Sequence, residues 1–137
     1  VEAFIEQSEK KHSAELRLVI EGPWSLHELL HHRNPRERAL ELFSELRIWD
    51  TEENSGVLIY VSLPDRAIEI VADRGINARV KEGAWSDVAF QMSEHLQSRR
   101  VKEGLLHGLR SVHAILVEHF PSDIKRADEL PNTVLVL

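Results

Sequence analysis

Acidic and amide side chains occur at three places in this sequence, each at one end of an apolar segment. Glu15 begins the first such segment, Glu53 and Asn54 precede the second, and Asp73 follows the third. Calcium and magnesium prefer carboxylate and amide oxygens from separate loops, about six to eight for calcium and six for magnesium. If folding brings the three places to one end of a sheet, these four residues are candidate ligands of a divalent cation.

Two further acids, Asp50 and Glu52, lie in the loop that leads to Asn54. An alternative interpretation is that all these side chains are solvated loop acids, with Asp73 capping a turn. Their spacing does not form a closed ion-binding motif such as the acidic loop of an EF-hand. At the level of the sequence both interpretations stay open.

A cation bound in this way would also permit hydrolysis of a phosphate ester. It would lower the pKa of a bound water toward about 7 and neutralise a phosphoryl oxygen, while Arg74 or Arg66 clamped the substrate. Asp65 and Arg66, however, fall in a predicted hairpin turn at the opposite end of the sheet from Asp73. For these two residues a turn former and a surface ion pair are the simpler interpretation.

Residues 27–31 read H-E-L-L-H, which on a helix would place two imidazoles on one face for zinc, with Glu28 as general base. Pro23 and Pro35 confine any helix here to a short stretch, and Glu28 has a capping role opposite Ser25. The sequence offers no convincingly placed third ligand. We therefore interpret the match as accidental, since short motifs match by chance.

The composition excludes several functions. Because there is no cysteine, disulfides, thiolate zinc sites and a cysteine nucleophile are absent. Neither G-x-G-x-x-G nor Walker spacing occurs, so we expect no nucleotide cofactor. The formal charge of −6, with basic residues scattered between acidic ones, argues against nucleic acid as a partner.

The length of 137 residues fits one domain with a single core. No apolar run approaches the roughly 20 residues of a membrane span, so we predict no transmembrane segment in this chain. Residues 1–11 alternate charged and apolar side chains, unlike a signal peptide. We accordingly expect a soluble segment that is cytoplasmic or peripheral to a membrane rather than secreted.

Hydrophobic periodicity predicts the elements that position these residues. An amphipathic helix ends near His12, and the alternation of residues 14–20 predicts a strand. A capping-box pattern at Ser25 opens a short helix, and the Asn-Pro pair at 34–35 opens a longer one over 36–46. We expect the longer helix to pack one apolar face on the sheet, made of Ala39, Leu40, Phe43 and Leu46.

The apolar run at 57–61 predicts a central strand, and a turn at 63–66 leads to a strand over 67–72, which together form an antiparallel hairpin. Residues 73–75 end the second strand, and Gly75 permits a positive φ there. Two helices follow, with apolar faces at Trp85, Val88, Ala89, Met92 and Leu96, and at Val101, Leu105, Leu109, Val112 and Leu116.

This order of elements predicts an α/β fold, a three-layer α/β/α sandwich with a small mixed β-sheet flanked by helices. We divide the chain into an α/β domain at 1–121 and a C-terminal extended tail at 122–137. The last residues, 133–137, are β-prone and are expected to pair with a sheet edge or with a partner.

Several segments together resemble the TPM domain family, in particular its stand-alone bacterial branch. The similar segments are 13–17, 36–44, 54–61, 65–66, 70–76, 78–80, 119–121 and 129–131. The family is named for a thylakoid lumen protein, a photosystem II repair protein and a worm membrane protein. The resemblance implies an α/β/α fold; some relatives bind calcium or other divalent cations, and plant members have been proposed to be acid phosphatases. Fold analogy alone does not supply an activity.

Our functional prediction is a divalent-cation-binding accessory or protein-interaction module, with calcium or magnesium as cofactor and a membrane-associated or envelope protein as partner. The alternative is a metal-assisted acid phosphatase acting on phosphomonoesters, for which the sequence does not place a base, a clamp and an open metal position together. A third hypothesis is a structural domain that assembles through residues 133–137.

Overall fold

The computed structural model describes residues 14–22, 34–51, 55–120 and 134–137. The helix predicted up to His12, the short helix predicted at Ser25 and the H-E-L-L-H segment lie outside these residues. The described elements follow one another as β1 (Glu15–Glu21), α3 (Pro35–Glu45), β2 (Gly56–Ser62), β3 (Ala67–Ala72), α4 (Arg74–Asn77), α5 (Ala84–Gln97), α6 (Val101–His119) and β4 (Leu135–Val136).

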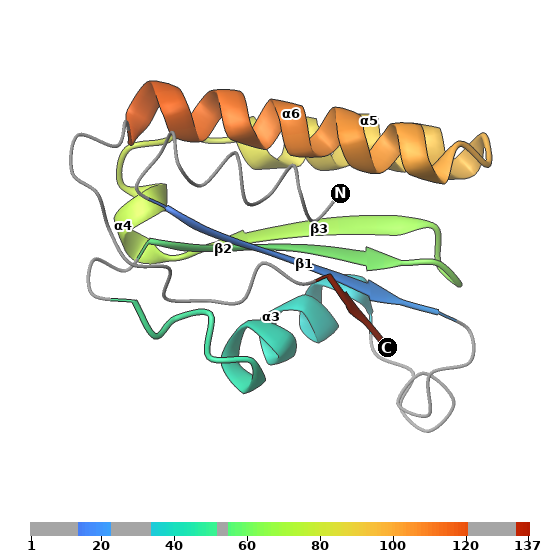
Figure 1. The fold of residues 1–137 in the computed structure, drawn as a ribbon, viewed down its shortest axis with the longest axis horizontal. Helices are drawn as coiled ribbons and strands as arrows, with labels where there is room; N and C mark the ends of the chain where they lie inside the picture. The colour runs from blue at the N-terminus through green and yellow to red at the C-terminus, as the bar shows by residue number, and fades with distance from the viewer. Residues whose placement is uncertain (1–13, 23–33, 52–54, 121–133) are drawn as a thin grey trace.

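The elements form three layers, with α3 below the sheet and the pair α5 and α6 above it in Figure 1. The strand order is β3-β2-β1-β4. β1 runs parallel to β2 and to β4, whereas β2 and β3 are the predicted antiparallel hairpin. The α/β sandwich with a mixed sheet is therefore confirmed.

The sheet separates two apolar layers because successive strand residues point to opposite faces. Leu16 and Leu18 of β1 face α5 and α6, while Val19 faces α3. β2 is buried along its whole length, as its unbroken apolar sequence predicts for a central strand. This two-sided burial fixes the register of β1 against β2, since a slip of one residue would exchange the two faces.

Helix α3 begins as predicted, with the Asn34 side chain accepting a hydrogen bond from the Glu37 amide (2.8 Å) and Pro35 at the first helical position. Ala39 and Leu42 are buried against the sheet, but the prediction that Leu40 packs there was wrong, because its side chain is 48% exposed. The buried stripe is centred on Ala39 and Leu42, and Leu40 lies 100° further around the helix.

Helix α5 buries Val88, Met92 and Leu96, as predicted. Helix α6 buries Leu105, Leu109, Val112 and Leu116, also as predicted. Val101 was predicted on this face and is instead exposed at the first turn of α6. Gly104 and Gly108 let the helices approach, since a Cβ at either would collide with His95 or Met92 of α5.

Among the glycines that the structure describes, Gly83 has a positive φ of 86°, whereas Gly75, whose residue type would permit one, does not. Gly75 lies inside α4, which begins directly after β3 and continues the chain with helical dihedrals. Gly83 ends the following turn and precedes α5, where the left-handed conformation favours glycine.

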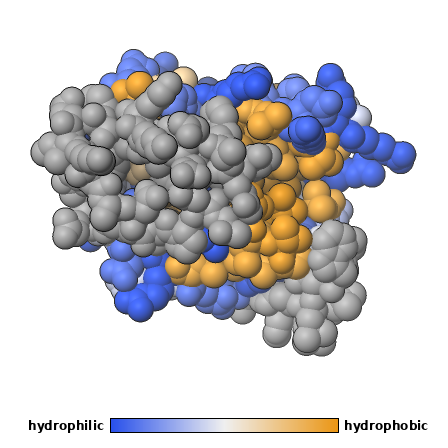
Figure 2. All heavy atoms as spheres, viewed as in Figure 1, coloured by the Kyte–Doolittle hydropathy of each residue, from blue (hydrophilic) through white to orange (hydrophobic). Residues whose placement is uncertain are grey.

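Strand β4 joins the end of the chain to the sheet. Val19 pairs with Leu135 and Ile20 with Val136, so residues of the predicted extended tail form its outer strand. Figure 2, in the view of Figure 1, shows apolar surface where β4 and β1 meet, and Val136 there is 57% exposed. The division of the chain at residue 121 stays a prediction.

In the part of the chain that the structure describes, no helix has the length and apolarity needed to cross a membrane.

Candidate functional site

Gly56 stands at the centre of the sheet end where the sequence places its candidate ligands. On one side it pairs with Glu15 of β1, whose amide donates to the Ser55 carbonyl (3.0 Å). On the other side the Asp73 amide donates to the Gly56 carbonyl (2.9 Å). The structure therefore brings Glu15 and Asp73 to the same end of the sheet, as expected, with Gly56 between them.

Both carboxylates leave the sheet on its α3 face. Glu15 lies four positions before Val19 in β1, and Asp73 lies two positions after Val71. Because an even spacing keeps two strand residues on one face, both acids share the α3 face with these valines. Neighbouring strands lie about 4.8 Å apart, so the two α-carbons, two strand spacings apart, are separated by roughly 10 Å. This distance is within the combined reach of a glutamate and an aspartate side chain that turn toward each other.

The backbone carbonyl of Ile48 fills the space that a side chain on Gly56 would occupy. A Cβ built on Gly56 would collide with this carbonyl oxygen and with the Ile48 side chain. Ile48 follows α3 and is buried in the lower apolar layer. A carbonyl oxygen thus lies over Gly56, the residue that stands between Glu15 and Asp73 in the sheet, and the sequence pattern did not reveal it.

The two oxygens of Asp73 have different surroundings. Oδ1 accepts a hydrogen bond from the Arg74 amide (2.7 Å), because Asp73 is the N-cap of α4. Oδ2 is shielded from solvent and accepts no hydrogen bond from the residues that the structure describes. The alternative role of Asp73, capping a turn, is therefore confirmed for one of its oxygens.

The remaining predicted ligands do not complete this group within the described residues. Glu53 and Asn54 lie outside the described residues. The residues that flank the undescribed range 52–54 are joined, since the Ser55 amide donates to the Thr51 hydroxyl (2.8 Å). Asp50 forms an exposed ion pair with Arg47 (2.9 Å). Across the described ranges, no three acidic or histidine side chains gather closely enough to hold a metal ion.

Arg17 and Arg74 are cationic residues close in the fold to Glu15 and Asp73, so they affect which charge a ligand at this sheet end can carry. Arg17 shares the α3 face with Glu15, and burial lowers the pKa of its guanidinium. Arg74 is exposed at the first position of α4, beside Asp73. Asp65 accepts from the Ser62 hydroxyl (2.9 Å) in the hairpin turn, so it and Arg66 lie at the other end of the sheet, as predicted.

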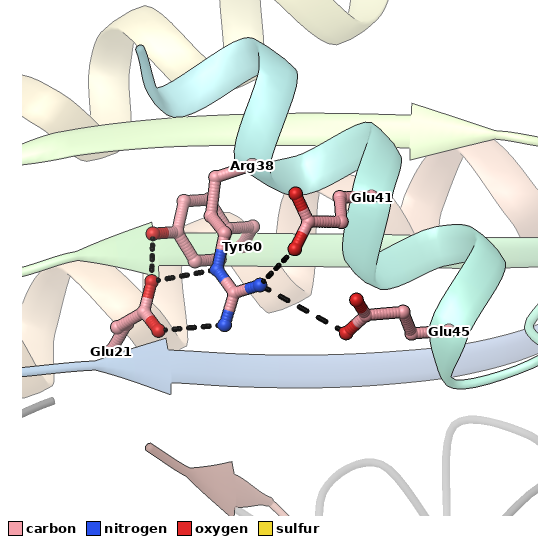
Figure 3. A network of polar contacts seen from close by, with 5 residues as sticks. All are labelled: Glu21, Arg38, Glu41, Glu45 and Tyr60. Carbon is pink, nitrogen blue, oxygen red and sulfur yellow. Dashed lines mark hydrogen bonds and ion pairs between the residues drawn. The ribbon is translucent and has the colours of Figure 1, made fainter. Parts of the chain in front are cut away.

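A second polar group lies under α3, near the opposite end of β1, and sequence reasoning missed it. Figure 3 shows Glu21 and Tyr60 of the sheet and Arg38 of α3 turned toward one another. Arg38 binds Glu21 through two parallel hydrogen bonds, from Nε to Oε1 (3.0 Å) and from Nη2 to Oε2 (2.9 Å). The Tyr60 hydroxyl donates to the same Glu21 Oε1 (2.7 Å). Glu41 accepts from the remaining Arg38 nitrogen (2.9 Å).

This group is buried and its charges are compensated. Burial lowers the pKa of Arg38, but the hydrogen bond and negative charge of Glu21 outweigh that effect and raise it overall. Burial and the adjacent Glu21 raise the pKa of Tyr60 well above its ordinary value. Both shifts favour a charged Arg38 and a neutral Tyr60 at neutral pH, and the hydrogen bonds of the group join α3 to the sheet.

Comparisons with known proteins agree with the fold. The family model of the TPM domain matches residues 1–115. The chain belongs to the TPM domain family. Among curated proteins, none matches it.

Two solved structures resemble this TPM domain. One is the NMR structure of BA42 protein from the psychrophilic bacterium Bizionia argentinensis, with 29% sequence identity and a TM-score of 0.83, covering 98% of this chain and 88% of that one. The other is the N-terminal domain of a protein from P. gingivalis, with 18% identity and a TM-score of 0.70, covering 89% of this chain and 76% of that one. The second likeness concerns the fold alone.

Proposed function

We propose that this TPM domain is a divalent-cation-binding accessory module that works with a membrane-associated or envelope protein. Its cation, calcium or magnesium, binds at the sheet end formed by Glu15, Gly56 and Asp73. The supporting observation is the solvent-shielded Oδ2 of Asp73, which accepts no hydrogen bond from the described residues and lies on the same face as the buried Glu15.

The donor set suits a hard cation. Two carboxylates and the Ile48 carbonyl are all oxygen donors, as calcium and magnesium require. Glu53 and Asn54 are proposed as further ligands because Asn54 directly precedes Ser55 in the chain, and water would complete the coordination. Binding to the native state alone raises the free energy of unfolding, by about 2.7 kcal/mol at one hundred times Kd.

A melting experiment tests the proposal. Thermal unfolding is followed with calcium, with magnesium and with a chelator, for the parent chain and for Asp73→Asn. Asparagine is as good an N-cap as aspartate, so this variant keeps α4 and removes only the charge that would bind the cation. We expect a melting temperature that rises with calcium or magnesium in the parent chain and barely changes in Asp73→Asn.

Asp65→Asn, at the other end of the sheet, is the matched control and should respond to the cation as the parent chain does. An unchanged melting temperature of the parent chain at millimolar calcium and magnesium would exclude the cation. The alternative phosphatase is tested in the same samples with an aryl phosphate. Metal-dependent hydrolysis that Asp73→Asn abolishes would replace the accessory role by an enzymatic one.

A further inference from the structure

Two turns meet at the end of the sheet that is opposite Asp73. One is the hairpin turn between β2 and β3, and the other joins α5 to α6; both lie at the right-hand end of the molecule in Figure 1. A cavity of about 190 Å³ lies between them and is lined by Leu63, Arg66, Leu96, Arg99 and Val101. Pockets for drug-sized ligands measure roughly 300–1,000 Å³, so this cavity has room for a short ligand.

The two turns have the same local construction. The Arg66 amide donates to the Leu63 carbonyl (3.2 Å), and the Arg99 amide donates to the Leu96 carbonyl (3.0 Å). Each turn thus places an arginine three residues after a leucine. Leu96 is buried in the apolar layer between the sheet and the helices α5 and α6, and Leu63 packs against that layer. The cavity therefore combines an apolar wall with two cationic residues.

Both arginines have a left-handed backbone conformation, with φ of 49° at Arg66 and 61° at Arg99. Glycine adopts this conformation readily, whereas a residue with a Cβ is disfavoured in it. Among the described residues other than glycine, the one further case is Arg47 (φ 56°). Since glycine would close both turns more easily, the presence of arginine points to a role of the two side chains.

The side chains of Arg66 and Arg99 are exposed and have no carboxylate partner. Within the described residues neither guanidinium forms an ion pair or a hydrogen bond. By contrast, Arg47 pairs with Asp50 (2.9 Å). The two arginines at the cavity are therefore available to an anion from outside the chain.

No acidic side chain lines the cavity in the part of the chain that the structure describes. Asp65, next to Arg66, accepts a hydrogen bond from the Ser62 hydroxyl (2.9 Å). Glu69 follows in β3 and is paired with Arg36 of α3, on the other face of the sheet. Neither acid therefore belongs to the cavity wall.

The acids of the two helices also lie away from the cavity. Glu94 stands two residues before Leu96, and Glu103 stands two residues after Val101. Two residues correspond to about 200° around a helix, so each acid lies on nearly the opposite side from the lining residue.

The two turns are cationic although the chain as a whole has a formal charge of −6. Residues 63–66 and 97–103 contain four cationic side chains, Arg66, Arg99, Arg100 and Lys102, and two acidic ones, Asp65 and Glu103. The local charge therefore favours an anionic ligand over a neutral or cationic one.

We propose that this cavity binds a small amphiphilic anion, in which a carboxylate or phosphate group is joined to a short aliphatic chain. Arg66 and Arg99 hold the oxyanion from two separate turns, since a guanidinium presents paired donors that match carboxylate and phosphate oxygens. The aliphatic chain lies against Leu63 and Val101, which is 36% exposed. The site is at the other end of the sheet from the proposed cation site and does not depend on it.

Hexanoate is the probe, and its binding is followed by amide chemical shifts of the full chain. We expect the amides of Leu63, Arg66, Arg99 and Val101 to shift. Hexanol has the same chain without the charge, and acetate has the charge without the chain. Each should bind at least about tenfold more weakly than hexanoate, because each lacks one of the two kinds of contact.

Glycine substitutions remove the guanidinium groups without opposing the turns. Arg66→Gly and Arg99→Gly place at each position the residue that best adopts a positive φ, so both variants should fold as the parent chain does. Each should weaken hexanoate binding by roughly tenfold, as expected when a charged hydrogen-bond partner is lost. Arg47→Gly makes the same change at the left-handed arginine outside the cavity, and this matched control should leave binding unchanged.

Hexyl phosphate and vesicles of phosphatidylglycerol distinguish the sources of the anion. Binding of hexanoate or hexyl phosphate that requires both arginines assigns the cavity to a soluble ligand. Vesicle binding that requires both arginines, without binding of either soluble anion, assigns it to the head group of a lipid.

The proposal is overturned if neither the soluble anions nor the vesicles bind at millimolar concentration. It is equally overturned if hexanol binds as tightly as hexanoate, or if Arg47→Gly weakens binding as much as Arg99→Gly does.

Discussion

At the scale of single residues, Tyr60 shows how the buried group under α3 is held in one protonation state. Its hydroxyl donates to Glu21 (2.7 Å), which also receives both hydrogen bonds of the Arg38 fork. Loss of the Tyr60 proton would place a second negative charge against Glu21 in a site shielded from water. Burial and this neighbour therefore favour the neutral phenol.

Titration of Tyr60 is directly measurable because it is the only tyrosine in the chain. We expect phenolate absorbance of the folded protein to appear well above pH 10.0, the ordinary value, and to return to that value in denaturant. Because the folded-state pKa is raised, the stabilisation is complete below pH 10 and is lost as the pH rises through the folded value. Phenolate formation near pH 10 in the folded protein would show that the hydroxyl is not enclosed as described.

At the scale of elements, two glycines permit close contacts of different kinds. A side chain on Gly56 would collide with the backbone carbonyl of Ile48, whereas one on Gly108 would collide with the flexible end of Met92. Backbone cannot move without displacing the segment after α3, but a methionine side chain adopts other rotamers easily.

We therefore expect Gly56→Ala to lower the free energy of unfolding by about 1–3 kcal/mol. For Gly108→Ala we expect a much smaller change, since alanine favours the helical conformation over glycine by about 1 kcal/mol and offsets the rearrangement of Met92. Urea denaturation of both variants measures the difference. Equal losses in the two variants would contradict this explanation.

The hairpin and the long C-terminal helix could be predicted because their patterns are local. The unbroken run in β2 and the turn at 63–66 match their elements within one or two residues, and the repeat from Val101 to Leu116 begins with α6 and ends three residues before its last. Leu40 was misplaced because periodicity gives the spacing of an apolar face and not the direction in which the sheet lies.

The candidate site was predicted in part, for a similar reason. Parallel pairing of the first two strands and a hairpin suffice to bring Glu15 and Asp73 together. The Ile48 carbonyl could not be found in this way, because a backbone oxygen is present at every position. Arg38 has the sequence pattern of a solvated helix residue, and only the folded chain shows that it lies over Glu21.

At the scale of the whole molecule, β4 closes the sheet on the side of β1. The Leu137 amide donates to the Ile20 carbonyl (2.7 Å), and its own carbonyl accepts from the Gly22 amide (2.9 Å). Leu135 and Leu137 also pack against the lower apolar layer. The last residues thus contribute both sheet pairing and apolar burial.

Removal of residues 134–137 should therefore lower the melting temperature by roughly 5–10 °C, as expected when about 2 kcal/mol of burial and pairing is lost. Amide exchange in the second half of β1 should become faster. Val136→Ser, which changes only an exposed side chain, is the control and should melt with the parent chain. A truncated chain that melts at the parent temperature would show that β4 adds nothing to stability.

The single turn α4 has a consequence for how distant surfaces communicate. Asp73 begins it at the oxygen-lined end of the sheet, and Asn77 ends it on the Ala72 carbonyl, next to Trp85. An ion bound at Asp73 that tilted this turn would alter the hydrogen bond at its other end. Linkage makes such an effect reciprocal, so a change at the Asn77 end would alter the affinity for that ion by the same factor.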